Sequence, residues 1–143
     1  MKTFMPDHRL VATNVLVCEW PLSQVWLVND SRYPWIMLVP ARESASEIFD
    51  LHELDQIQLG RESLYLARQM AEHFSAHKMN VAAIGNVVPQ LHIHHVARFE
   101  SDATWPGTVW GVGNAIPYSD GALRDLVVLL RGLLAWSSTL KQL

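Results

Sequence analysis

The chain alternates between short extended runs and two longer stretches with helical periodicity. The extended runs are rich in β-branched and aromatic residues, and breakers such as Pro21 and the polar turn at residues 29–34 separate them. The predicted strands cover residues 10–19, 23–29, 35–39, 79–84 and 90–98, and residues 85–89 form the turn before the last strand. Because turn signals join most neighbouring runs, we expect an antiparallel sheet of about five strands.

The longer helical stretch lies between residues 44 and 78. Asp50, followed three residues later by Glu53, predicts a helix N-cap with its reciprocal partner. Apolar residues then recur every three or four positions, namely Leu54, Ile57, Leu64, Ala67, Ala71 and Phe74. This spacing predicts one long helix that packs this stripe against the sheet.

The second helical stretch follows Ser119, a favoured N-cap residue. Its apolar stripe consists of Leu123, Leu126, Val127, Leu130, Leu133 and Leu134. We expect a C-terminal helix that packs on the core or in a dimer surface. The elements together predict the α+β class, with a long helix on the sheet and this additional C-terminal helix.

Composition limits the classes of function. A length of 143 residues with 50% hydrophobic residues fits a single domain spanning residues 1–143. The net charge of -3 creates no general attraction for nucleic acid or an anionic membrane. The single cysteine, Cys18, excludes an internal disulfide, and the apolar stretch 126–136 is too short to span a bilayer. We therefore expect a soluble cytoplasmic protein without nucleic acid or membrane partners.

The run at 87–98 places three histidines within four residues. Successive side chains of a strand point to opposite faces, so Leu91, Ile93 and His95 share one face. Because Leu91 and Ile93 belong in a core, His95 is predicted to be partly buried or near an edge. The opposite face carries the polar row Gln90, His92 and His94.

This polar row suits chemistry at phosphorus. A neutral imidazole is a nucleophile if its other nitrogen donates to a fixed acceptor such as a backbone carbonyl. We assign His92 this role, with His94 beside it to hydrogen-bond the leaving group or a phosphate oxygen. In the preceding loop, Asn86 and the Val88 backbone N–H are candidate donors to non-bridging oxygens. Arg98 either adds a cation at the rim or is a solvated surface side chain.

The segment from Gly85 to Arg98 resembles the signature of the histidine triad (HIT) superfamily. In this match the middle and last histidines of the triad fall on His92 and His94, and Gln90 replaces the first. The closing arginine falls on Arg98, and the phosphate-binding loop falls on residues 86–88. The resemblance covers about residues 10–98, which leaves 99–143 as a C-terminal extension.

The resemblance implies a homodimeric, nucleotide-binding HIT-like fold that needs no cofactor. Its members hydrolyse or transfer nucleoside monophosphate groups through a nucleotidylated middle histidine, here His92. The substrate would be a nucleoside phosphoramidate or a dinucleoside polyphosphate. Asn29 matches the position that binds the ribose hydroxyls, although an Asn chosen for turn chemistry fits equally well. Pro34-Trp35 stands where members often carry Gly-His, which is a second departure.

Other functions remain open from the sequence. The domain would be a catalytically weak nucleotide-binding module if Gln90 preserves geometry but removes a titrating group. The pattern His92-Ile93-His94 also matches strand ligands for a transition metal, but no third ligand lies at typical spacing. His73 and His77 lack a nearby carboxylate or cysteine, so we expect no metal there either. A purely structural role for the histidines is the least favoured interpretation.

The segment 99–117 is long and carries two tryptophans, Trp105 and Trp110. Loops of this length are usually functional or pack against the rest of the domain. One hypothesis is that a tryptophan covers the site or the subunit boundary. The alternative is that both pack on their own sheet.

Overall fold

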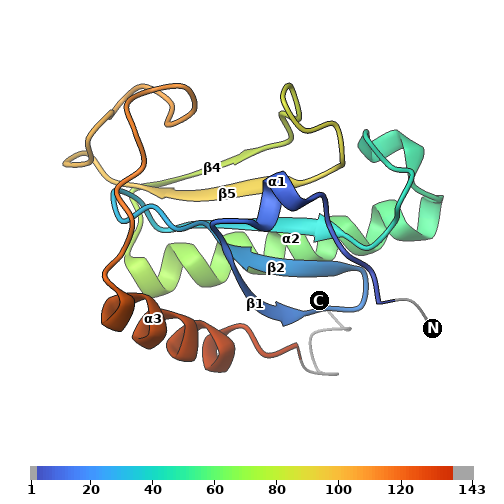
Figure 1. The fold of residues 1–143 in the computed structure, drawn as a ribbon, viewed down its shortest axis with the longest axis horizontal. Coiled ribbons are helices and arrows are strands. Elements are labelled where there is room, and N and C mark those ends of the chain that lie inside the picture. The colour runs from blue at the N-terminus through green and yellow to red at the C-terminus, as the bar shows by residue number, and fades with distance from the viewer. Residues whose placement is uncertain (1–2, 137–143) are drawn as a thin grey trace.

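The computed structural model describes residues 3–136 (Figure 1). In this part of the chain, five strands form one sheet: β1 (Val15–Glu19), β2 (Ser23–Leu27), β3 (Trp35–Pro40), β4 (Lys78–Ala82) and β5 (Ile93–Arg98). Their order across the sheet is β1-β2-β3-β5-β4, and every neighbouring pair is antiparallel. The predicted α+β class and antiparallel sheet are confirmed. The histidine strand β5 lies inside the sheet, whereas β4 is an edge strand.

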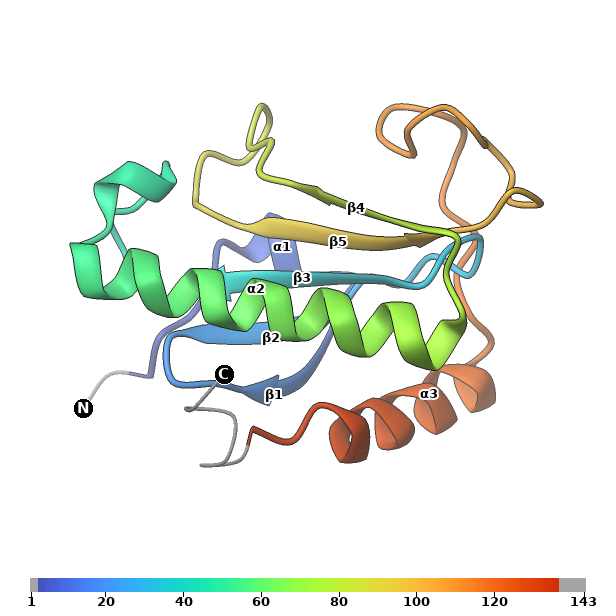
Figure 2. The ribbon, with the colours of Figure 1, turned by 180° about the vertical axis from the view of Figure 1, so that it is seen from behind.

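The helices lie on both sides of this sheet. The long helix α2 (Glu53–Phe74) crosses one face, and the one-turn helix α1 (His8–Val11) lies against the other (Figures 1 and 2). A single 3-10 turn, η1 (Ile48–Asp50), precedes α2, and α3 (Asp120–Leu133) packs beside β1. No helix of residues 3–136 is long and apolar enough to cross a membrane.

Two predicted strands begin later than the sequence indicated. Residues 8–11 form α1 because Asp7 caps them, its side chain accepting the Arg9 backbone N–H at 2.9 Å, so β1 begins only at Val15. β5 begins at Ile93 and not at residue 90. The turn at Gly85 and the bond from Leu91 N–H to the Ala45 carbonyl, 3.0 Å, hold residues 85–92 as a loop. Gln90 and His92 therefore lie on this loop, just before the ladder.

The start of α2 also differs from the prediction. Asp50 caps the turn η1, where its carboxylate accepts the backbone N–H groups of Ser46 and Glu47 at 3.1 and 2.9 Å. Helix α2 begins at Glu53 behind His52, which makes no side-chain cap bond. The predicted reciprocal pair of Asp50 and Glu53 is thus wrong, because the 3-10 turn uses the Asp50 carboxylate first.

The side of α2 that packs against the sheet differs most from the prediction. Its buried side chains are Leu59, Glu62, Leu66 and Met70. Three residues of the predicted stripe, Leu54, Ile57 and Leu64, are exposed. Because α2 is apolar on two sides, periodicity alone did not identify which side meets the sheet.

The buried Glu62 explains how α2 is oriented. Its carboxylate accepts the backbone N–H groups of Leu22 and Ser23 at 2.9 and 3.0 Å, and the Gln58 amide at 2.9 Å. These bonds satisfy a charge that would otherwise be unfavourable to bury. They also fix the helix against the β1–β2 turn.

Helix α3 agrees with its prediction. The Ser119 hydroxyl accepts the Ala122 N–H at 3.3 Å, and Val127, Leu130 and Leu134 are buried. These side chains join the main core between the sheet and α2. Smaller clusters lie on the opposite face of the sheet, around Met37 and around Tyr33. The histidine side chains of the site lie on that second face.

Candidate functional site

Strand β5 directs its histidines to both faces of the sheet. In the ladder His94 pairs with Met37 on β3 and with Ala82 on β4, and His95 pairs with Ile36 and Val81. His95 is completely buried on the α2 side, deeper than the partly buried or edge position that we expected. On the other side the rings of His92 and His94 meet edge to face, with their centroids 5.0 Å apart. The predicted separation of faces is confirmed.

His92 is held by the backbone of its own loop. Its Nδ1 lies 2.7 Å from the Gln90 carbonyl oxygen, and the side chain is 6% exposed. A carbonyl only accepts hydrogen bonds, so Nδ1 carries the proton. In the neutral ring, Nε2 is left with its lone pair, which is the arrangement that a nucleophilic imidazole requires.

His94 has the opposite tautomer. The indole Nε1–H of Trp35 donates to His94 Nδ1 at 2.9 Å, so the proton of the neutral ring sits on Nε2. Burial, followed by the neighbouring His92 and His95, lowers the pKa of His94 to about 3. His94 is therefore a neutral hydrogen-bond donor at physiological pH.

Gln90 is tied to the N-terminal segment. Its side-chain oxygen Oε1 accepts the backbone N–H of Asp7 at 2.6 Å. Because this bond occupies the oxygen, the amide NH₂ is the group left to donate toward a ligand. The segment before α1 thus positions the Gln90 side chain.

The loop before His92 borders a narrow cleft. Gly85 adopts a φ of +67°, and a Cβ there would lie 3.3 Å from the Val88 carbonyl oxygen. Such a backbone suits glycine. Asn86 is exposed, whereas the Val88 side chain is buried against Leu10, Met37 and Val39. The cleft is lined by Ser46, Glu47, Ala83, Ile84, Gly85, Gln90, Leu91 and His92.

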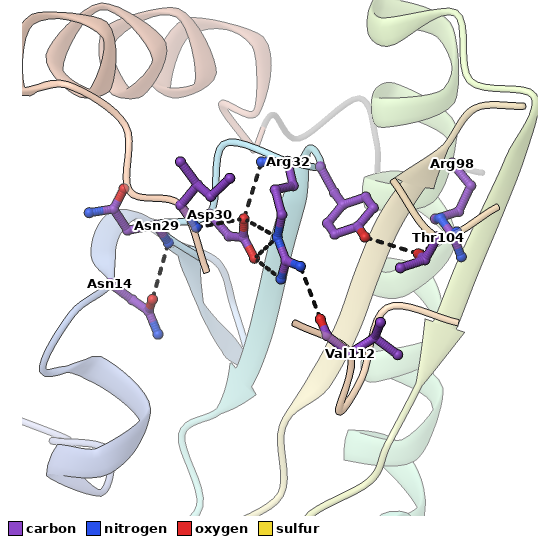
Figure 3. A network of polar contacts seen from close by, with 9 residues as sticks. Asn14, Asn29, Asp30, Arg32, Arg98, Thr104 and Val112 are labelled. Carbon is purple, nitrogen blue, oxygen red and sulfur yellow. Dashed lines mark hydrogen bonds and ion pairs between the residues drawn. The ribbon is translucent and has the colours of Figure 1, made fainter. Parts of the chain in front are cut away.

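Asn29 belongs to a polar network at one end of the sheet (Figure 3). Its Oδ1 accepts the Tyr118 N–H at 2.9 Å, and its backbone N–H donates to Asn14 Oδ1 at 3.2 Å. Next to it, Asp30 forms an ion pair with Arg32 at 2.8 Å. The Asn29 oxygen is thus used within the protein, and its NH₂ is the part of the side chain that can still donate.

Arg98 is a structural anchor. Its side chain is 1% exposed, forms a two-point ion pair with Asp102 at 2.8 and 3.0 Å, and donates to Asn80 and to the Gly107 carbonyl. The expectation of a solvated surface arginine is wrong. Arg98 shares the face of His94, but four residues of strand separate them by about 13 Å. The structure does not bring it together with the two histidines.

The segment after β5 brings one tryptophan to the histidines. The ring of Trp110 lies 5.7 Å from that of His94 and 6.3 Å from that of Trp35, centroid to centroid. Trp105 lies elsewhere, against His77 and the Arg98 guanidinium. The hypothesis that a tryptophan covers the site therefore fits Trp110 alone.

Two residues of the site were not assigned from sequence. Trp35 was noted only as a departure from the family pattern, although its position two residues before Met37 places both on one face. The role of Asp7 was not predictable from its side chain, because it holds Gln90 through its backbone N–H.

A metal site has little support among the described residues. Within residues 3–136, no group of three or more His, Cys, Asp or Glu side chains is arranged to hold a metal ion. His77 Nδ1 instead lies 3.4 Å from the Glu100 carboxylate, and the His73 ring meets that of Phe74 edge to face. The two triad histidines already use their Nδ1 atoms for bonds within the protein.

Comparisons with known proteins agree with this geometry. Residues 9–101 match the HIT domain. A histidine triad protein from Bradyrhizobium japonicum has 37% identity and a TM-score of 0.89, covering 94% of this chain and 100% of that one. A histidine triad protein from Marinobacter aquaeolei has 41% identity and a TM-score of 0.89, with coverages of 93% and 97%. One from Sinorhizobium meliloti has 40% identity and a TM-score of 0.85, with coverages of 88% and 93%. No curated protein matches the chain.

Proposed function

The chain belongs to the HIT domain family, and on that premise we propose that it is a hydrolase or nucleotidyl transferase acting on nucleotides. The bond to be broken is a phosphoanhydride or a phosphoramidate at a nucleoside phosphate. The observation that carries this proposal is the 2.7 Å contact between His92 Nδ1 and the Gln90 carbonyl. It leaves His92 Nε2 free to attack phosphorus.

The first step forms a covalent intermediate. The lone pair of His92 Nε2 attacks the phosphorus, an N–P bond forms, and the bond from phosphorus to the leaving group breaks. The Nδ1–H bond to the Gln90 carbonyl stabilises the positive charge that the ring gains. His94 Nε2–H hydrogen-bonds the leaving group. A phosphate leaves with the electron pair of the broken bond, whereas an amine takes that pair together with a proton from solvent.

The second step releases the nucleotide. Water, or another nucleophile in a transfer reaction, attacks the same phosphorus, and the N–P electron pair returns to His92 Nε2. The proton of the attacking water passes to solvent. Because Gln90 does not titrate, it orients the phosphate with its NH₂ and takes no part in proton transfer.

The remaining site residues bind the substrate in this proposal. Asn86 and the Val88 backbone N–H donate to non-bridging phosphate oxygens, and Asn29 donates to a ribose hydroxyl. Arg98 acts on the site only through the loop that it anchors. Residues 1–143 function as one domain, since α3 of the extension shares the core of residues 10–98.

We also propose a homodimer formed through α2 and the edge strand β4. Leu64 is 74% exposed on α2, and Val81 is 48% exposed on β4. Between these elements lies a hollow of about 290 Å³ whose lining includes Leu59, Gly60 and Val81. An unpaired edge strand beside exposed apolar side chains is a natural pairing surface.

The dimer is tested by Leu64→Asp, with Val128→Asp as its control. Val128 is equally apolar and 69% exposed, but it lies on α3. In analytical ultracentrifugation we expect Leu64→Asp to sediment as a monomer and Val128→Asp to remain a dimer. A wild-type monomer at micromolar concentration would contradict the proposal.

The catalytic proposal is tested by trapping the intermediate. Rapid mixing with a dinucleoside polyphosphate, followed by acid-free quenching and mass spectrometry, is expected to show a nucleotidyl adduct on His92. His92→Asn keeps a donor to the Gln90 carbonyl but removes the nucleophilic nitrogen, so turnover should fall on the order of 10⁴-fold. Intact turnover in this variant would refute the mechanism.

The alternative is a nucleotide-binding module with little turnover. It is favoured by Gln90, which occupies the position of a titrating triad residue. Nucleoside monophosphate binding measured by calorimetry, without an adduct and without turnover, would select this alternative. The proposed location is the cytoplasm, in keeping with a single cysteine in the whole sequence.

A further inference from the structure

The hydrogen bond between Trp35 and His94 determines what His94 can do for a leaving group. Trp35 precedes Met37 by two residues on β3, and Met37 pairs with His94, so the indole reaches the histidine from the neighbouring strand. Its Nε1–H lies 2.9 Å from His94 Nδ1, and the two rings meet edge to face with a centroid distance of 5.6 Å. An indole N–H only donates, so Nδ1 must accept.

This bond excludes the protonated form of His94. An imidazolium ion needs protons on both nitrogens, and the proton on Nδ1 would then face the indole N–H. The ionisable groups that influence the pKa of His94 are His92 and His95, both of which favour the neutral ring, as does its burial. From β3, β4 and the segment after β5 it meets Trp35, Met37, Ala82 and Trp110, none of which titrates.

A neutral imidazole N–H can hydrogen-bond a departing atom, but it is too weak an acid to transfer its proton at neutral pH. This limits the leaving groups that the site can release. A phosphate group departs as a stable anion and needs only hydrogen bonds. An amine departs only after its nitrogen has received a proton, because an amide anion is far too basic to leave in water.

We propose that Trp35 holds His94 as a neutral Nε2–H donor, and that the site therefore cleaves phosphoanhydrides in preference to phosphoramidates. This inference rests on the proposed nucleophilic role of His92. In the preferred reaction His92 Nε2 bonds to phosphorus, the P–O bond to the second phosphate breaks, and that phosphate leaves with the electron pair while His94 stabilises it. Trp35 is a positioning residue in this scheme, since it acts through His94.

The first test compares two substrates with one nucleoside. We expect kcat/KM for a diadenosine polyphosphate to exceed that for adenosine 5′-phosphoramidate by at least about a hundredfold at pH 7.5. Residual cleavage of the phosphoramidate should rise as the pH falls, because its proton must come from solvent. Cleavage of the phosphoramidate at an equal or higher rate would overturn the inference.

The second test removes the indole N–H. Trp35→Phe keeps an aromatic ring but lets the proton of the neutral His94 ring move to Nδ1, so phosphoanhydride cleavage loses its fixed Nε2–H donor and the ratio of phosphoramidate to phosphoanhydride cleavage should rise at least about tenfold. The matched control is Trp110→Phe, because the Trp110 Nε1–H is buried near His94 and has no hydrogen-bond partner among residues 3–136. We expect this control to leave the ratio unchanged, whatever its effect on the absolute rates.

Nitrogen NMR gives a readout that a general loss of structure would not reproduce. The ¹⁵N shifts of His94 should show a proton on Nε2 in the wild type and in Trp110→Phe, and a change of tautomer or protonation in Trp35→Phe. An unchanged ratio and unchanged His94 shifts in Trp35→Phe would overturn the role of Trp35.

Adduct formation and substrate preference together distinguish an error in the proposed mechanism from an error in the role of Trp35. If neither substrate gives an adduct on His92 or any turnover, the nucleophilic mechanism is wrong and this inference falls with it. If both substrates give the adduct and the phosphoramidate is the better one, His92 is the nucleophile and only the inference about Trp35 and His94 is wrong.

Discussion

His94 and His95 follow one another in β5 and lie on opposite faces of the sheet. His95 is completely buried, donates from Nδ1 to the Ile93 carbonyl at 3.1 Å and accepts the Ser63 hydroxyl at Nε2 at 2.7 Å. His94 is partly exposed, and its ring makes one hydrogen bond within the described residues, which leaves Nε2–H to meet a ligand. One residue type therefore serves two purposes at adjacent positions: His94 faces the candidate site, and His95 belongs to the core.

The comparison shows that the hydrogen-bond partners, and not the residue type, decide the role of each histidine. Both rings are neutral because burial lowers their pKa, to about 3 for His94 and to about 4 for His95. They differ in whether both nitrogens are occupied. Both ring nitrogens of His95 are occupied, whereas His94 presents one donor beside His92, the proposed nucleophile.

The largest effect on stability should come from Arg98, which shares the site face with His94 but is as buried as His95. Arg98→Ala leaves the buried Asp102 carboxylate without its counter-ion, so the free energy of unfolding should fall by about 3–5 kcal/mol. Urea denaturation measures this value. Arg42→Ala, which breaks an exposed ion pair with Asp55, is the control and should lower it by less than about 1 kcal/mol. Equal losses in the two variants would show that Arg98 is not an anchor.

A smaller loss is expected from His95 itself. His95→Ala opens a cavity and leaves the Ser63 hydroxyl without its acceptor, so the free energy of unfolding should fall by about 2–4 kcal/mol. The protein that remains folded should still form the His92 adduct. Ser63→Ala removes a single hydrogen bond and should lower stability by about 1 kcal/mol. Loss of adduct formation in a folded His95→Ala protein would contradict the separation of the two faces.

The smallest effect is the dependence of stability on pH. The folded-state pKa of His95 lies below the ordinary value, so the unfolded chain binds the proton first as the pH falls. The stabilisation is fully present above about pH 6.5 and is lost toward pH 4, with about 1–2 kcal/mol lost from His95 between pH 6.5 and 5. Urea titrations at each pH measure it. His95→Gln should flatten the curve relative to the wild type, and an unchanged slope would show that another group is responsible.

Much of the site followed from local pattern. Alternation along residues 91–98 placed His95 with Leu91 and Ile93, and His92 with His94, because strand side chains alternate whatever surrounds them. The cap at Ser119 and the stripe of α3 were also correct, since both depend on contacts within a few residues. Alternation did not reveal the depth of His95, which depends on α2 lying above it.

Other features depended on contacts between distant segments. Periodicity located α2 but assigned Leu54, Ile57 and Leu64 to the wrong face, because the sheet and the buried Glu62 bonds choose the face. The partner of Arg98 was not predictable either, since Asp102 and Gly107 meet it only after the chain turns back over the sheet.

By itself, the sequence determined the α+β elements, the strand that carries the histidines and the alternation that separates His92 and His94 from His95. These properties follow from backbone geometry and nearest-neighbour chemistry, which the chain carries wherever it folds. Only the tertiary structure decided that Trp35 fixes the tautomer of His94, that Asp7 holds Gln90 and that Arg98 is buried. Each of these depends on a hydrogen bond or ion pair whose partners meet only when strands, loops and termini pack together.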